Sequence, residues 1–169
     1  SHFFEHMMFK GTHVIGTKDI KSDLEIIEEQ ERVREDMRKE LEVMRARLRH
    51  GEIPDLTSPE SQTDKYRELD KKFDALVQRQ RENIIKDHMD QIYTSNGGEF
   101  LNASTNEDST NYFLRLPRNR LELWAWLESD RLANPVFREF YSERDVVFEE
   151  RRLRTESIVP PASSLCTIA

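Results

Sequence analysis

The feature that most restricts the fold of this chain is a stretch of about 70 residues in which apolar side chains recur every three or four positions. This spacing places them on one side of an α-helix. Gly51, Pro54 and Pro59 interrupt the pattern, so it predicts two antiparallel helices, a helical hairpin over about residues 24–90. The first helix would carry Leu24, Ile27, Val33, Met37, Leu41, Met44 and Leu48, and the second Tyr66, Leu69, Phe73, Leu76, Ile84, Met89 and Ile92. We interpret the hairpin as two solvated helices joined along one seam, with a partner-binding arm as the alternative.

Composition limits the size of the hydrophobic core. Apolar residues make up 36% and charged residues 35% of the 169 residues, whereas globular domains average about 45–50% and about 25%. Nine Phe, four Tyr and two Trp are nevertheless too many aromatic residues for an acidic disordered chain. The net charge of -7 argues against a nucleic-acid partner, and no apolar run approaches the ~20 residues of a membrane span. The sequence predicts one domain, or a piece of a larger one, with a modest core.

Strands and shorter helices are predicted outside the hairpin. Residues 2–9 read as a short helix that Gly11 ends. Residues 99–105 and 110–116 read as two strands around a turn. A helix capped by Asn119 and a last helix over about residues 136–156 follow, and residues 158–169 read as an irregular tail. The predicted fold class is α+β.

Residues 2–6 read His-Phe-Phe-Glu-His, which is a spacing suited to a metal site. His2 and His6 lie one helical turn apart, so both imidazoles can bind one ion, and neutral imidazole suits zinc. Glu5 overhangs the same face beside them and is the candidate general base. Chance would produce roughly 0.02 such matches in this composition. The alternative is an ordinary helix face with Glu5 as a surface acid near the helix N-terminus.

A hydrolytic zinc site needs a third protein ligand. Cys166 lies in the irregular tail, and the other histidines lie in a loop or on the hairpin, so a carboxylate of the last helix is preferred. Glu143 and Glu150 are two helical turns apart and share a face, with Glu149 about 100° away. Periodicity alone does not choose between Glu149 and Glu150.

The segment HFFEHMMFKGT resembles the inverted zinc signature H-x-x-E-H of the pitrilysin, insulin-degrading-enzyme and mitochondrial-processing-peptidase family, the inverzincins. The stretches GGEFLNASTNEDSTNYFLRLP, LELWAWLESDRLANPVF and ERDVVFEERR look, in this order, like the edge-strand hairpin, the following helix and the third-ligand helix of that family. The resemblance implies that His2, His6 and Glu150 bind Zn²⁺, that Glu5 is the catalytic base, and that Glu143 is an auxiliary acid near the site.

The resemblance also implies a fold and an activity. Residues 1–157 would form an incomplete catalytic domain, a mainly antiparallel sheet packed by helices, with the helical hairpin as an insertion. Its parent would be a zinc-dependent metalloendopeptidase that hydrolyses peptides or unfolded proteins. The substrate would add as a strand along backbone near Asn102, Ala103 and Ser104.

The family pattern continues beyond both ends of this chain and includes a second, related domain. We therefore expect a fragment that is weakly active or inactive without its companion domain or a partner subunit. The alternatives are a non-catalytic family member and an interaction module that acts through the helical arm, with zinc only stabilising the fold. The sequence does not fix the compartment, and the bacterial periplasm is the preferred option.

Overall fold

A computed structural model describes residues 2–158 of the chain. Helix makes up 62% and strand 11% of it, which confirms the α+β class. The chain divides into two compact units, unit 1 up to Ile15 and from Asp87 onward, and unit 2 from Gly16 to Lys86. The part of the predicted irregular tail that follows Ile158 lies outside the described residues.

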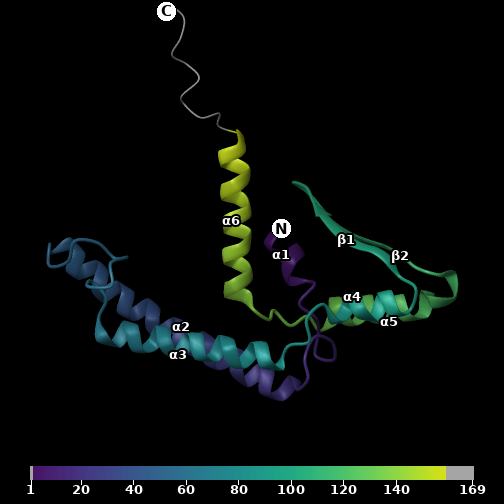
Figure 1. Cartoon of the computed structure of the whole chain (residues 1–169), viewed down its shortest axis with the longest axis horizontal. Coiled ribbons are helices and arrows are strands. Elements are labelled where there is room, and N and C mark those ends of the chain that lie inside the picture. Colours follow the sequence, from purple (N-terminus) through teal and green to yellow (C-terminus); the bar gives the residue numbers. More distant parts are fainter. Residues whose placement is uncertain (1, 159–169) are drawn as a thin grey trace, which may run out of the picture. The chain divides into compact units, whose positions relative to one another are not determined.

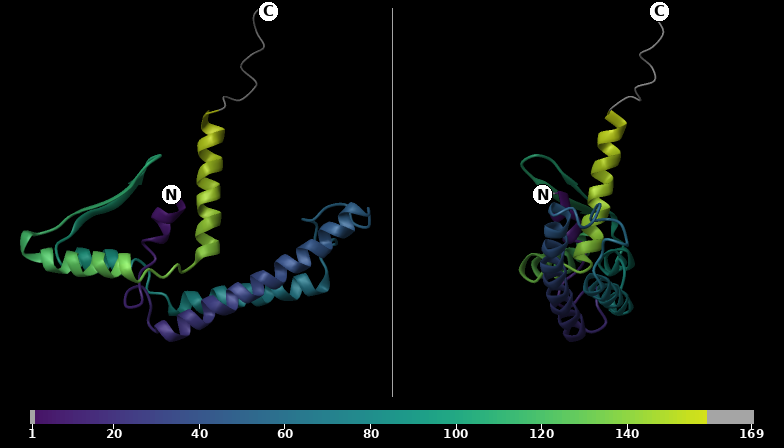
Figure 2. Two further views of the ribbon diagram at one scale, coloured as in Figure 1. Left: turned by 180° about the vertical axis from the view of Figure 1, so that it is seen from behind. Right: turned by 90° about the vertical axis from the view of Figure 1, so that its left-hand side faces the viewer.

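Unit 2 consists of two long helices, α2 (Ile20–Arg49) and α3 (Asp64–Asn83). They run side by side in the views of Figures 1 and 2. The Asp19 side chain caps α2 by accepting hydrogen bonds from the backbone N–H groups of Lys21 and Ser22. The predicted second helix is too long, because α3 ends at Asn83 instead of continuing to Ile92.

The seam between α2 and α3 follows a regular alternation of three and four residues. On α2 the buried positions are Asp23, Ile26, Gln30, Val33, Met37, Glu40 and Met44. This is the heptad spacing of a coiled coil. Three of these positions are polar, so an apolar stripe does not predict them. Leu24, predicted to face the seam, is 42% exposed.

Buried polar side chains in the seam pair across the two helices. The Gln80 amide donates to Asp23 Oδ1 at 3.3 Å, and the Gln30 amide donates to Gln80 Oε1 at 3.3 Å. Glu40 accepts a hydrogen bond from the Thr63 hydroxyl at 2.8 Å. A polar pair at one level of a helical seam is satisfied in one register only, so these contacts align α2 with α3.

The two ends of unit 2 are hydrogen-bonded to each other. Thr17 and Ile84 form an isolated antiparallel bridge. The Lys18 N–H donates to the Asn83 carbonyl at 2.9 Å, and the Ile85 N–H donates to the Gly16 carbonyl at 3.0 Å. The first and last residues of the hairpin therefore lie next to each other.

Unit 1 contains the remaining elements. They are α1 (His2–Met7), α4 (His88–Ser95), β1 (Glu99–Thr105), β2 (Thr110–Arg115), a 3₁₀ turn (Arg118–Arg120), α5 (Leu121–Ala133) and α6 (Phe140–Ile158). Its core includes Ile15, Met89, Tyr93 and Leu127. Met89 therefore belongs to this core and not to the seam of unit 2, which is why the predicted stripe ran past the end of α3.

The predicted pair of strands is present. β1 and β2 are antiparallel, with Ala103 opposite Tyr112 and Thr105 opposite Thr110. The predicted larger antiparallel sheet is wrong for residues 2–158, where the only sheet is this two-stranded one. The other periodic segments form helices because their apolar residues recur every three or four positions. None of the helices described is long and apolar enough to cross a membrane.

A buried arginine connects the start of unit 1 to the segment before α6. Arg138 is 1% exposed. Its guanidinium donates to three backbone carbonyls, those of Lys10 at 3.0 Å, Thr12 at 2.7 Å and Ile15 at 3.1 Å. This contact occupies a non-helical segment, so α6 begins at Phe140 and not near Val136 as predicted.

Gly11 permits the loop that this arginine holds. Its φ is +96°, and a Cβ atom there would lie 2.2 Å from the carbonyl oxygen of Ile15. We expect Gly11→Ala to lower the free energy of unfolding by more than the ~1 kcal/mol of backbone strain alone. Chemical denaturation measures the loss.

Gly51→Ala is the matched control for Gly11→Ala. Gly51 also has a positive φ, +73°, but no atom lies within 4 Å of its would-be Cβ. Equal losses in the two variants would contradict the close approach at Gly11.

Candidate metal centre

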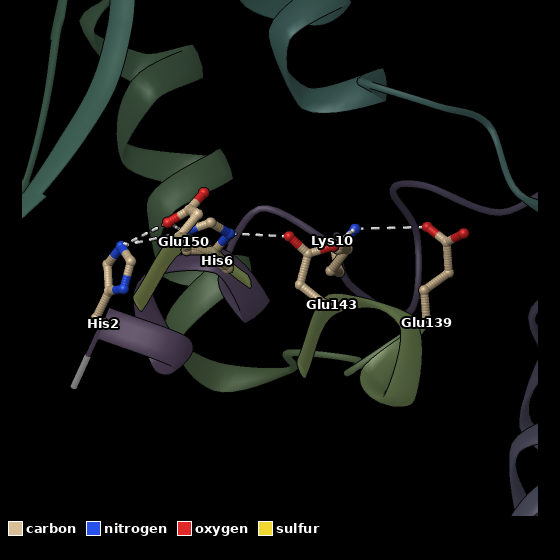
Figure 3. Close-up of polar contacts among 6 residues, drawn as sticks. All are labelled: His2, His6, Lys10, Glu139, Glu143 and Glu150. Atoms are coloured by element: carbon tan, nitrogen blue, oxygen red, sulfur yellow. Dashed lines mark hydrogen bonds and ion pairs between the residues drawn. The ribbon is translucent and has the colours of Figure 1, made fainter. Parts of the chain in front are cut away.

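The candidate ligands come from two helices of unit 1, α1 and α6. His2 and His6 are four residues apart on α1 and therefore point to the same side. Aromatic contacts hold α1 against the start of α6: the rings of Phe3 and Phe140 meet edge to face with centroids 5.0 Å apart. This packing brings His2 and His6 to the face of α6 that carries Glu150, as Figure 3 shows.

His2, His6 and Glu150 form a compact group of three potential ligand atoms. The two Nε2 atoms of His2 and His6 are 3.3 Å apart. The nearer oxygen of Glu150, Oε2, is 3.5 Å from His2 Nε2 and 3.8 Å from His6 Nε2. All three predicted metal ligands therefore converge on one point.

These three separations fit zinc. Ligand atoms about 2.0–2.1 Å from a tetrahedral ion lie about 3.3 Å from one another. The His2–His6 side of the triangle is 3.3 Å, and the two sides to Glu150 are longer, at 3.5 and 3.8 Å. Two imidazoles and one carboxylate are also the donor set of catalytic zinc sites that keep one position open.

The structure distinguishes the two carboxylates that periodicity left open. Glu149 pairs with Arg152 one turn further along α6, with an Oε1–Nη2 distance of 2.5 Å. This contact, led by the hydrogen bond from Arg152, lowers the pKa of the Glu149 carboxyl. Glu149 belongs to an exposed ion pair, and Glu150 faces the histidines (Figure 3).

Glu143 lies on the other side of the His6 ring. Its Oε1 is 2.9 Å from His6 Nδ1, and its Oε2 is 2.5 Å from Lys10 Nζ. Burial acts to raise the pKa of the Glu143 carboxyl, but the hydrogen bonds from Lys10 and His6 outweigh it and lower that pKa. Since a carboxylate only accepts, the contact with Glu143 favours the His6 tautomer with its proton on Nδ1, which is the tautomer that can offer Nε2 to a metal.

Glu5 is directed toward the strand hairpin. The Thr105 hydroxyl, at the end of β1, donates to Glu5 Oε2, and Thr105 Oγ1 is also 2.9 Å from the hydroxyl oxygen of Thr110. Tyr112 is close enough to be affected by the same acid: burial raises the Tyr112 pKa, Arg131 opposes the rise, and the charge of Glu5 adds to it. Glu5 is not one of the three clustered ligands.

Asn102, Ala103 and Ser104, the predicted substrate-binding residues, lie in β1. Asn102 and Ser104 are exposed and Ala103 is half-buried. One edge of β1 pairs with β2, and within residues 2–158 no strand pairs with its other edge. At that edge the Ala103 N–H donates to the Asn102 side-chain oxygen at 2.8 Å, a contact that an added strand would have to replace.

The sequence did not predict Lys10, which contacts Glu143, or Thr105, which contacts Glu5. The available signal for Lys10 was its position four residues after His6. Thr105 gave no local signal, because it is 100 residues from Glu5 along the chain. Arg131 is a further buried side chain near Glu5: it is 2% exposed, and its guanidinium lies over the Tyr112 ring at 4.2 Å from the ring centroid.

No protein-family model, curated protein or solved structure matches this chain. What can be inferred about function therefore comes from the geometry of the centre and the sequence motif.

Proposed function

We propose that this chain carries the zinc site of a metalloendopeptidase resembling the pitrilysin, insulin-degrading-enzyme and mitochondrial-processing-peptidase family. The observation that carries the proposal is the convergence of His2, His6 and Glu150, with His6 oriented by Glu143. The motif alone requires only two histidines on one helix. A carboxylate from a helix more than 130 residues later is an independent contribution to the same point.

The proposed reaction is hydrolysis of a peptide bond in a peptide or unfolded protein. Zinc held by His2, His6 and Glu150 would supply the Lewis acidity that activates water near neutral pH. Glu5 acts as general base, and because Thr105 occupies its Oε2, Oε1 is the atom that takes the proton. The substrate backbone lies along the free edge of β1 at Asn102, Ala103 and Ser104.

A companion domain or partner subunit is part of the proposal. The support is the amount of exposed apolar surface on unit 1. Phe100 is 68%, Phe113 50%, Leu121 65% and Leu132 74% exposed. Apolar side chains this exposed on neighbouring elements, β1, β2 and α5, offer contacts that a companion domain or partner would cover.

Zinc content tests the proposal. We expect about one zinc per chain after dialysis against a dilute chelator, and loss of that zinc in both His6→Ala and Glu150→Gln. Glu149→Gln is the matched control, since it removes the neighbouring carboxylate and retains the ligand. Metal analysis of the folded proteins gives the answer. Absence of zinc from folded wild type, or equal losses in Glu149→Gln and Glu150→Gln, would contradict the site.

A second candidate function is an interaction module that acts through the helical hairpin. It is favoured by one observation, that the hairpin forms a compact unit of its own. Replacing residues 17–84 with a short turn separates the two functions. Retained zinc binding together with retained partner binding after this deletion supports an accessory hairpin, whereas loss of partner binding with zinc retained supports the module.

A further inference from the structure

Lys10 lies between two carboxylates, that of Glu143 on α6 and that of Glu139, the residue immediately before α6. Its Nζ is 2.5 Å from Glu143 Oε2 and 3.4 Å from Glu139 Oε2. The Lys10 and Glu143 side chains are 21% and 17% exposed, so water competes only partly for this contact. Figure 3 shows the resulting row of side chains from Glu139 through Lys10 and Glu143 to His6.

Both oxygens of Glu143 are occupied, each by a different partner. Oε1 faces His6 Nδ1 at 2.9 Å, and Oε2 faces Lys10. Two contacts fix the plane of a carboxylate, whereas one contact leaves it free to turn about that contact. The orientation of the group that holds the His6 ring therefore depends on Lys10.

We propose that Lys10 is a positioning residue of the metal centre: it acts through Glu143 to hold the His6 ring and thereby sets the affinity for zinc. The inference rests on the proposed zinc site and adds a determinant that the His-x-x-Glu-His motif does not contain. Lys10 touches neither His2, His6 nor Glu150 in the contacts described, so its effect passes through Glu143.

The charge of Lys10 supports the same role. Glu143 and Glu150 both approach His6, one at Nδ1 and the other near Nε2. Lys10 offsets negative charge on the Nδ1 side, where Glu139 also contributes a carboxylate. Removing Lys10 leaves a half-buried carboxylate with one donor instead of two, which favours its rotation toward water.

The test measures zinc affinity by competition with a chromophoric chelator. Partners of a metal-binding histidine typically change metal affinity 10–100-fold when they are replaced. We expect Lys10→Met to weaken zinc binding by about tenfold or more and Lys10→Arg to restore most of it. Lys72→Met is the matched control: it removes a lysine–glutamate pair with Glu29 in unit 2 and should leave the affinity unchanged.

A double variant tests whether the effect passes through Glu143. If it does, Lys10→Met combined with Glu143→Gln binds zinc no more weakly than Glu143→Gln alone. Cobalt-substituted protein gives a second reading, because the visible spectrum of Co²⁺ changes with ligand geometry. We expect a shifted spectrum in Lys10→Met and a wild-type spectrum in Lys10→Arg.

The outcomes separate the two proposals. A folded wild type that binds no zinc overturns the proposed function, and the role of Lys10 with it. Zinc bound equally well by wild type and a folded Lys10→Met overturns the role of Lys10 alone. Additive losses in the double variant overturn the route through Glu143.

Discussion

Replacement of Glu5 by glutamine is expected to slow peptide hydrolysis by about 10²–10⁴-fold, the contribution of a positioned general base. Glutamine keeps the shape of the side chain and its hydrogen bond with Thr105, but it does not take up a proton. Since Glu5 is not among the three clustered ligands, zinc content should stay at the wild-type level. A quenched fluorescent peptide and metal analysis on the same samples give both values.

Thr105→Val is the companion variant. It removes the hydroxyl that holds Glu5 and keeps the shape of the side chain, so we expect a smaller loss of hydrolysis than in Glu5→Gln. The comparison uses conditions in which the wild type, with a companion domain or partner if it needs one, hydrolyses the peptide above background. Equal rates for wild type and Glu5→Gln under these conditions would contradict the assignment of Glu5 as the base.

The largest expected effect on stability is that of Arg138→Met. The variant removes the buried guanidinium from three backbone carbonyls, of which that of Ile15 still accepts the Thr12 N–H. One unsatisfied buried polar group costs about 1–3 kcal/mol, so for the carbonyls of Lys10 and Thr12 we expect unit 1 to lose about 2 kcal/mol or more. Trp124 and Trp126 both lie on α5 in unit 1, so their fluorescence during urea unfolding reports on this unit.

Arg120→Met serves as control for this variant, because Arg120 is exposed. We expect its unfolding midpoint to change little. A midpoint for Arg138→Met equal to that of Arg120→Met would show that the carbonyls find other partners.

Much of the secondary structure could be predicted because its signals are local. The strand hairpin follows from two short alternating segments around a turn, and α2 from apolar residues at helical spacing. The end of α3 could not be predicted in this way. Met89 continues the spacing of the seam, yet it packs in the core of unit 1, and this choice depends on tertiary contacts.

The candidate site also contains residues with a local sequence signal and residues without one. His2, Glu5 and His6 follow from the spacing of one helical turn. Glu150 was predicted from the family resemblance, because periodicity alone did not distinguish it from Glu149. The structure distinguishes the two, since Glu149 forms an ion pair with Arg152. Contacts such as Lys10 with Glu139, 129 residues apart, carry no local signal at all.

The hydrogen-bonded base of unit 2 has a consequence for how the length of this chain can change. The Ile85 N–H donates to the Gly16 carbonyl, so the two ends of the hairpin stay at a fixed separation whatever the length of its helices. Closing a flexible loop costs entropy that grows with the length of the loop. In this hairpin the packing of α2 against α3 holds the two ends together, so added helix length does not add to that cost in the same way. Insertion of seven residues into each helix would keep the alternation of three and four along the seam. Such a hairpin can lengthen or shorten by whole heptads while its two ends stay together.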